Sequence, residues 1–290
     1  MRILLTGATG FIGGRLLPLL GQHDVLCLTR DAPALPTMPN ARALAGSLSE
    51  PAGYSSAVKA FRPDWCIHLA WEGLPDYSIA RSRANLDSGI RLFEVLAGSG
   101  VRRVIVAGTC WEYGPAAGVV REDDAGHGLA IFPAAKHAQH LVLDSMARAG
   151  GFEHRWARVF FSYGAGQRAA ALLPGCHAAY AAGRAPDIRS PHVAQDFIHV
   201  DDVARGLLAL TNADCGSGAF NIGSGDPASV AAVVNLVAAH FGQPPPYAKT
   251  AATSGFWADM AHTHGATGWR AAISIEAGVR QTLSMLDKGA

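Results

Sequence analysis

Short apolar stretches and amphipathic stretches alternate through the first half of the chain. Almost wholly apolar runs lie at 3–7, 25–29, 65–70, 104–108 and 155–160. Between them, apolar positions recur at helical spacing over 11–20, 50–61, 78–98 and 131–149. Uninterrupted apolar runs are typical of strands that are covered on both faces, as in a parallel sheet. The alternation therefore predicts an α/β fold built on a doubly wound parallel sheet of the Rossmann type.

The second half is less regular. Its pattern predicts helices over 169–182, 201–211, 228–241 and 274–286, and strands over 196–200 and 220–225. Residues 183–195 combine Gly, Pro, Arg and His and predict a loop or lid, and the proline-rich segment 31–45 predicts a surface loop that enters a strand.

Composition narrows the class of protein. Apolar residues make up 49% of the 290 residues, which excludes global disorder, and the net charge of +1 without charge runs gives no support for binding nucleic acid or an anionic membrane. No apolar run reaches the roughly 18 residues of a membrane span. The five cysteines are odd in number and never spaced as CxxC, so we expect reduced thiols in a cytoplasmic protein.

A glycine-rich turn follows the first predicted strand and opens the first predicted helix. Glycine lets the backbone tighten and lets its N–H groups approach a pyrophosphate, and the helix N-terminus adds partial positive charge. The turn therefore predicts a dinucleotide-binding site. Its contacts would be Gly7, Thr9, Gly10, Phe11, Ile12 and Gly13.

The spacing GxxGxxG, spelled TGATGFIG at 6–13, resembles the extended short-chain dehydrogenase/reductase family. The resemblance continues through HLA at 68–70, AGTCWEYG at 107–114, RVFFSYGAG at 158–166, QDFIHVDDVA at 195–204 and FNIGSG at 220–225. It implies a Rossmann domain over 1–162 and 196–222, and a smaller, split substrate-binding domain with a lid over 163–195 and 223–290. The further cofactor contacts that it implies are Ser47, Leu48, Leu69, Ala70 and Asn85.

The end of the second predicted strand bears on the choice of cofactor. An acidic residue there would bind the adenosine ribose, whereas a basic residue favours a 2′-phosphate. Arg30 occupies this place and Asp31 follows it directly. We therefore expect NADP(H), while NAD(H) stays open. Where the family often has an Asp near the adenine, this chain has Ser47.

The family resemblance also implies the catalytic residues, with one departure. Thr109 stands in the Ser/Thr position and Lys136 in the Lys position, but Phe132 stands where the family has its proton-donating Tyr. Three explanations are open: an inactive cofactor-binding relative, an engineered inactive variant, or a different proton source. Candidate sources are Thr109, Tyr113, Tyr163, a water, or a hydroxyl of the substrate.

Aromatic residues replace polar ones around the expected substrate site. Gln195 stands in place of a diphosphate-binding Arg, and Phe161 in place of an Asn. With Trp71 and Trp111 at strand ends, the pattern favours a flat, apolar ketone, and it resembles the ketoreductases of this family that act on angucyclinone polyketides. Further candidate substrate contacts are Tyr113, Tyr163 and Arg189.

The resulting prediction is a NAD(P)H-dependent ketoreductase for an aromatic or polyketide ketone. A nucleotide-sugar 4-ketoreductase or epimerase stays open, because Arg184 and Arg189 could clamp a diphosphate. An inactive cofactor-binding regulator stays open as well. Helices 78–98 and 131–149 are candidates for the seam of a homodimer.

Two other groups of residues are weaker candidates for a functional site. His262-Thr263-His264 and the pair His137 and His140 lack an evident third ligand, so no metal site is predicted. Glu112 is a candidate acid/base beside Thr109. However, the Asp-Glu pair of the family's dehydratases is Cys110-Trp111 here, which argues against dehydration.

Overall fold

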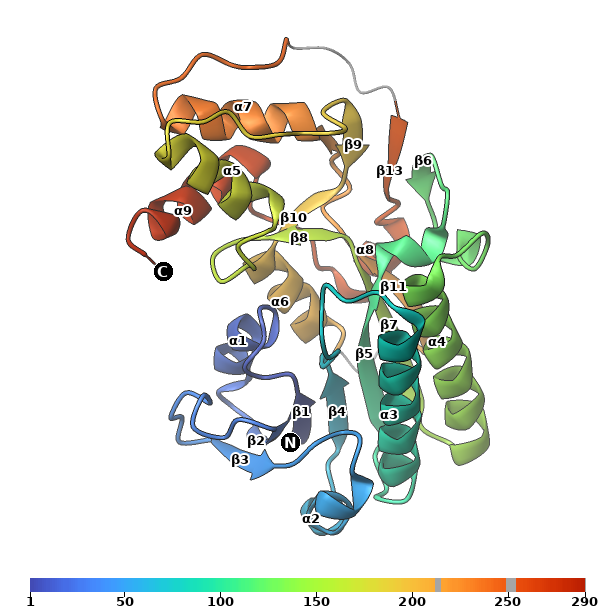
Figure 1. The fold of residues 1–290 in the computed structure, drawn as a ribbon. Helices are drawn as coiled ribbons and strands as arrows, with labels where there is room; N and C mark the ends of the chain where they lie inside the picture. The colour runs from blue at the N-terminus through green and yellow to red at the C-terminus, as the bar shows by residue number, and fades with distance from the viewer. Residues whose placement is uncertain (212–214, 249–253, 290) are drawn as a thin grey trace.

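The computed structural model describes residues 1–211, 215–248 and 254–289. Its largest sheet has seven strands, all parallel, in the order β11-β7-β5-β4-β1-β2-β3 (Figure 1). This order reverses between β1 and β4, which is the arrangement of a doubly wound sheet and confirms the predicted fold class. The strands are β1 (Arg2–Thr6), β2 (Asp24–Thr29), β3 (Ala41–Ala45), β4 (Trp65–His68), β5 (Arg103–Thr109), β7 (Glu153–Val159) and β11 (Gly218–Ile222).

Helices cover both faces of this sheet, as the apolar strands require. One face is covered by α1 (Gly13–Leu16), the 3₁₀ turn that continues it (Leu17–Leu20), and α6 (Val200–Ala209); the other is covered by α2 (Ser55–Phe61), α3 (Ile79–Ala97) and α4 (Ile131–Gly150). Each face has its own buried apolar cluster, and α3 and α4 lie side by side (Figure 1).

A second group of elements lies over the carboxyl ends of the central strands. Helices α5 (Leu172–Ala181), α7 (Val230–His240) and α9 (Ile275–Leu286) pack on one another around a third apolar cluster (Figure 1). A two-stranded sheet joins β8 (Phe161–Tyr163) to β10 (Phe197–His199). A four-stranded sheet has the order β12-β9-β13-β6, from β12 (Ala228–Ser229), β9 (Val193–Gln195), β13 (Ser254–Ala258) and β6 (Gly118–Val120), and α8 (Ala261–Thr267) packs near β11.

The structure departs from the predicted elements at short strands. The predicted lid 183–195 ends in β9, and the predicted strand 196–200 pairs with β8 rather than with the central sheet. Residues 118–120, assigned to the Rossmann part, form β6 and pair with β13 of the second group. Strands of three residues are too short to show periodicity, so only their tertiary partners reveal them.

Two further findings bear on the class of protein. All five cysteines are free and buried. Among the described residues, no helix is both long and apolar enough to cross a bilayer.

Candidate active site

A cavity of about 740 Å³ opens at the carboxyl ends of β1, β4, β5 and β7, between the central sheet and the second group of elements. In open α/β sheets this edge is where ligands bind. The described residues that line it are Gly7, Gly10, Phe11, Ile12, Gly13, Leu69, Trp71, Leu74, Tyr77, Thr109, Cys110, Trp111, Phe132, Val159, Phe160, Phe161, Ser162, Tyr163, Gly166, Gln167, Arg168, Ala170, Ala171, Leu172, Leu173, Gln195 and Phe197.

The glycine turn forms one wall and has the close packing that a dinucleotide turn needs. Gly7 has a φ of +75°, and a Cβ there would lie 2.8 Å from the Ala70 amide nitrogen. A Cβ on Gly13 would lie 2.0 Å from the Gly7 carbonyl oxygen. A side chain at Gly7 would therefore push the turn away from the segment that follows β4, and one at Gly13 would push α1 away from the turn. The backbone is free to approach a phosphate here, and this arrangement fits a nicotinamide dinucleotide.

Three aromatic rings gather around that of Phe132. The centre of the Phe132 ring lies 5.3 Å from that of Trp71, 5.1 Å from Tyr77 and 5.8 Å from Trp111, and Tyr77 lies 5.4 Å from Trp111. The Trp71 and Trp111 rings meet Phe132 edge-on, a geometry that aromatic pairs favour. We call these four residues the aromatic wall. Sequence reasoning missed Tyr77, which lies in the loop between β4 and α3; its signal was its place after a central strand.

Lys136 lies behind the aromatic wall and does not line the cavity. Its Nζ donates to the Ala107 carbonyl oxygen at 2.8 Å and lies 4.3 Å from the centre of the Trp71 ring. Burial lowers the pKa of Lys136 to about 8, although the Glu112 charge favours the ammonium form.

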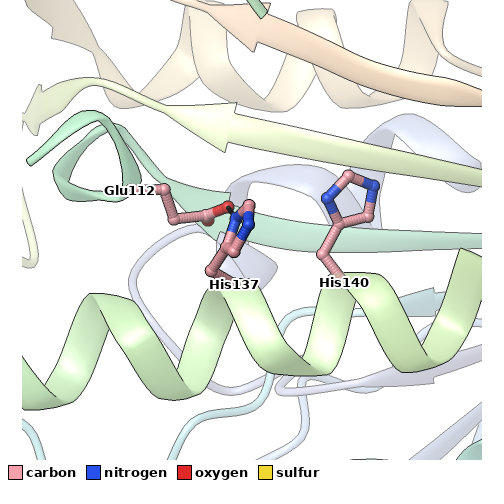
Figure 2. A group of neighbouring side chains, drawn as sticks. All are labelled: Glu112, His137 and His140. Carbon is pink, nitrogen blue, oxygen red and sulfur yellow. Dashed lines mark ion pairs between the residues drawn. The ribbon is translucent and has the colours of Figure 1, made fainter. Parts of the chain in front are cut away.

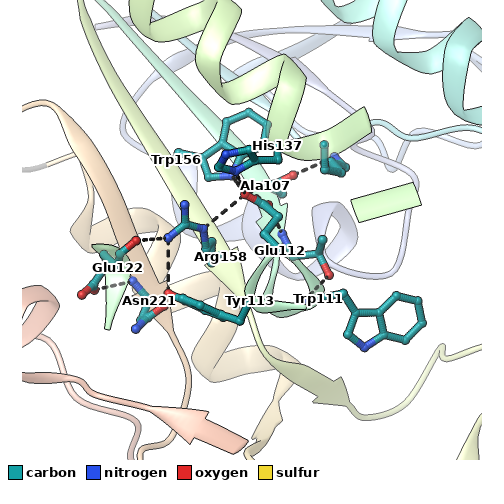
Figure 3. Close-up of polar contacts among 11 residues, drawn as sticks. Ala107, Trp111, Glu112, Tyr113, Glu122, His137, Trp156, Arg158 and Asn221 are labelled. Atoms are coloured by element: carbon teal, nitrogen blue, oxygen red, sulfur yellow. Dashed lines mark hydrogen bonds and ion pairs between the residues drawn. The ribbon is translucent and has the colours of Figure 1, made fainter. Parts of the chain in front are cut away.

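Thr109 stands at the end of β5 with its side chain at the cavity. Its Oγ1 accepts from the Trp111 N–H at 3.3 Å, and its own N–H donates to Glu112 Oε1 at 2.9 Å (Figure 3). Glu112 is fully buried beneath the turn Cys110–Tyr113 and also accepts from Trp156 Nε1. Glu112 therefore holds the backbone of Thr109 in place from the protein interior, and it does not reach the cavity to act as an acid or base.

Arg158 pairs with Glu112 inside the protein. Its Nε lies 3.2 Å from Glu112 Oε2, and both side chains are almost wholly buried. Burial alone would raise the pKa of Glu112, but hydrogen bonding to His137 and the Arg158 charge hold it below its usual value. The guanidinium also donates to the Tyr113 hydroxyl and to the Glu122 carbonyl oxygen (Figure 3).

The two tyrosines predicted at the substrate site do not present their hydroxyls to the cavity. Tyr113 is buried outside the lining, and its hydroxyl donates to Asn221 Oδ1 (Figure 3). The Tyr163 ring does line the cavity, but its hydroxyl is turned toward α9, where a Cβ on Gly278 would lie 2.1 Å from it. Strand and turn geometry decide which way each ring points: the Tyr163 ring lines the cavity as predicted, whereas Tyr113 lies outside the lining.

The predicted adenosine contacts lie outside the cavity, near the ends of β2, β3 and β4. Arg30 is exposed and pairs with Glu72, at 3.1 Å between Nη1 and Oε2. The Asn85 side chain is hydrogen-bonded to the Glu72 backbone: its Oδ1 accepts from the Glu72 N–H, and its Nδ2 donates to the Glu72 carbonyl oxygen. Ser47 bonds Ser49 at 2.8 Å. Thr9, Leu48 and Ala70 are likewise absent from the cavity lining.

The outer end of the cavity is only weakly polar. Phe161, a predicted substrate contact, lines it together with Gln195, which stands in place of the family's Arg, and with Gln167 and Arg168, which sequence reasoning missed. Arg189 is exposed and outside the lining. Among the described lining residues, Arg168 carries the one charged side chain.

Glu112, His137 and His140 lie close enough to suggest a metal site, with ligand atoms within 4.8 Å of one another. Figure 2 shows both imidazoles on one side of α4, with His137 facing the Glu112 carboxylate at 3.7 Å. However, Glu112 already accepts from Thr109, Trp156 and Arg158, and a metal ion would lie beside the Arg158 charge. His140 stacks on Trp156 with ring centres 4.9 Å apart. These contacts indicate a structural cluster.

Comparison with known proteins identifies the family. A model of the NAD dependent epimerase/dehydratase family matches residues 3–223. The chain belongs to this family. Two curated relatives align over almost their whole length. A 3-diazoavenalumate denitrifying reductase from a Streptomyces species is 26% identical, over 96% of this chain and 93% of the relative. A dTDP-6-deoxy-L-talose 4-dehydrogenase (NAD(P)(+)) from Kitasatospora kifunensis is 27% identical, over 97% and 94%.

Solved structures agree with this assignment. MoeE5 in complex with UDP-glucuronic acid and NAD matches with a TM-score of 0.84 and 27% identity, over the whole of both chains. Members of the family are NAD-dependent oxidoreductases and epimerases, so this chain has the fold and the dinucleotide turn of an enzyme of that group.

Proposed function

We propose that the protein is a NAD(P)H-dependent ketoreductase that transfers hydride to the carbonyl carbon of a ketone in an aromatic, polyketide-type natural product. The observation that carries this proposal is Phe132 at the centre of the aromatic wall, within the same cavity as Thr109 and the glycine turn. Ring pairs of this kind contribute about 0.5–1.5 kcal/mol each beyond simple burial, so a flat apolar substrate would be held by stacking.

Different residues of the chain would bind the cofactor and polarise the ketone. The glycine turn would hold the cofactor pyrophosphate, and the bound cofactor would supply hydride. The Thr109 Oγ1 accepts from the Trp111 N–H, so its own proton is free to donate to the ketone oxygen. A donor aimed at the oxygen where negative charge develops lowers the barrier. The family pattern assigns Lys136 to the nicotinamide ribose; to reach it, the Lys136 Nζ would leave the Ala107 carbonyl oxygen and turn toward the cavity.

The final proton would come from the substrate or from water. Phe132 has no proton to give, and the Tyr113 and Tyr163 hydroxyls are directed away from the cavity. A positioned general acid usually contributes about 10²–10⁴-fold. A phenolic or enolic hydroxyl hydrogen-bonded to the ketone of the substrate would supply this contribution internally.

NADP(H) is the proposed cofactor, and NAD(H) is the alternative. The proposal rests on Arg30 at the end of β2, whose planar guanidinium suits a 2′-phosphate. To bind one, Arg30 would exchange its exposed contact with Glu72 for the phosphate. Several solved neighbours, MoeE5 among them, hold NAD.

The test is a fluorescence titration of NADPH and NADH, with and without a panel of aromatic polyketide ketones, followed by cofactor oxidation at 340 nm. Ketone-dependent oxidation is the expected result. Cofactor binding without oxidation by any ketone would overturn the proposal in favour of a cofactor-binding regulator.

A nucleotide-sugar 4-ketoreductase or epimerase is a second candidate. The names of the Kitasatospora relative and of the MoeE5 complex favour it, as do Gln167, Arg168 and Gln195 at the outer end of the cavity. A diphosphate bound there would raise the melting temperature in the presence of UDP or dTDP. Oxidation of cofactor by a nucleotide sugar, without oxidation by the aromatic panel, would establish this function instead.

A diazo carbon is a third acceptor for the same site, suggested by the name of the Streptomyces relative. Hydride addition to an arenediazonium carbon forms the aryl C–H bond and releases N₂, so the reaction consumes no proton. The absence of a donor at Phe132 is compatible with that chemistry. Including an arenediazonium salt in the panel, with N₂ release as the readout, separates it from ketone reduction.

A further inference from the structure

Three helices of the second group bring two histidines and an aspartate together at the surface. His177 lies within α5, His240 is the last residue of α7, and Asp287 directly follows α9. His177 Nε2 lies 2.8 Å from Asp287 Oδ1, and His240 Nε2 lies 3.0 Å from Asp287 Oδ2. The three ligand atoms lie within 4.8 Å of one another.

We propose that His177, His240 and Asp287 form a binding site for a divalent transition-metal ion of the zinc class. Two imidazoles and one carboxylate are a frequent zinc ligand set, with the fourth position left to water. Ligands about 2.0–2.2 Å from a tetrahedral ion lie about 3.3 Å apart. Each imidazole nitrogen would move by about 0.5 Å or less from the carboxylate oxygen that it now contacts, and the three ligand atoms, all within 4.8 Å of one another, would close around the ion. Asp287 is 46% exposed, which leaves room for the water.

The charges around this cluster favour a cation, in contrast to the cluster at Glu112. The two imidazoles lower the pKa of Asp287, so it is a carboxylate at neutral pH. Among the described residues, Asp287 forms ion pairs with these two histidines and with no arginine or lysine, whereas Glu112 is paired with Arg158. An ion between Asp287 and the two histidines would take the place of their two hydrogen bonds, with each neutral imidazole coordinating through Nε2 and carrying its proton on Nδ1.

The site would also connect to the cavity. His177 lies on the same helix as Leu172 and Leu173, which line the cavity from the first turn of α5. Tying α5 to α7 and α9 would hold these two side chains in place, independently of which acceptor the enzyme reduces.

The experiment is isothermal titration of Zn²⁺ into the untagged, chelator-treated full chain, with thermal unfolding as a second readout. We expect one ion per chain, and an increase in melting temperature of about 5 °C at a hundredfold excess over Kd. Asp287→Asn and His177→Ala should each weaken binding at least tenfold. His127→Ala, an exposed histidine outside the cluster, should leave it unchanged.

Four results would overturn the site. Zn²⁺ could fail to bind. Binding could survive in the His177→Ala, His240→Ala double variant, or disappear only in His137→Ala. If Asp287→Asn lowers stability equally with and without Zn²⁺, the three residues stabilise the fold through their ion pairs and hold no metal.

Discussion

The Nζ of Lys136 lies 4.3 Å from the centre of the Trp71 ring, while the other side of the aromatic wall faces the cavity. The ammonium is thus held by a ring face and by the Ala107 carbonyl oxygen, and the Glu112 charge also favours its charged form. This arrangement explains how a cation stays buried beside an apolar substrate site.

Lys136 should make stability rise with pH above about 8. Its pKa is lowered to about 8 in the folded protein, against about 10.5 when unfolded. Between these two values Lys136 is more fully protonated in the unfolded chain than in the folded one. The contribution of Lys136 to the free energy of unfolding therefore increases by about 2 kcal/mol from pH 7.5 to 9.5. Urea unfolding of wild type and Lys136→Met at both pH values measures it. An identical pH slope in the two proteins would contradict the buried-cation geometry.

Phe132→Tyr tests where the proton comes from. If the substrate or water supplies it, restoring the hydroxyl should change kcat by less than tenfold with the ketone that the panel identifies. The control is Phe132→Leu, which removes the ring and should raise KM because stacking is lost. A gain near a thousandfold in Phe132→Tyr would show instead a disabled tyrosine enzyme.

Glu112→Gln should destabilise the fold strongly. Glu112 is fully buried, and its loss leaves the Arg158 guanidinium uncompensated, a change that typically costs about 3–5 kcal/mol. Glu112→Gln combined with Arg158→Met should recover part of the loss. Urea unfolding of the two single variants and the double variant gives the coupling. Additive losses would mean that the pair does not act as a unit.

Tyr113→Phe and Tyr163→Phe form a matched pair. The first removes a hydroxyl that bonds Asn221 and Arg158 and should lower stability by about 1–3 kcal/mol. The second removes a buried hydroxyl without a hydrogen-bond partner among the described residues, and should change stability by less than about 1 kcal/mol. Thermal unfolding measures both. Equal losses would refute the predicted difference between the two hydroxyls.

Arg30→Ala should change the choice of cofactor. Removing the guanidinium should raise the Kd for NADPH at least tenfold and change the Kd for NADH by less than about threefold, because only NADPH carries the 2′-phosphate. Glu72→Gln is the control: it frees Arg30 from its partner and should strengthen NADPH. Fluorescence titration gives both constants. If Arg30→Ala raised the Kd for both cofactors equally, Arg30 would have no role in the choice between NADPH and NADH.

The main elements and the dinucleotide turn were predictable from the sequence because they rest on local pattern. Continuous apolar runs require two covered faces, and only a parallel sheet with helices on both sides supplies them. Gly7 and Gly13 are needed where backbone approaches backbone, which leaves a signal at fixed spacing. Phe132, Thr109 and Lys136 were found by their places in a family pattern.

Tertiary structure alone decided which side chains meet. Tyr77 joins the aromatic wall because its loop folds back over α4, whereas Tyr113 turns into the interior because Asn221 and Arg158 bind its hydroxyl. Asp287 reaches His177 and His240 only because the ends of α7 and α9 pack beside the middle of α5. Spacing along a chain sets the face of a strand or helix, but contacts between distant segments depend on how whole elements pack, and no local pattern carries that information.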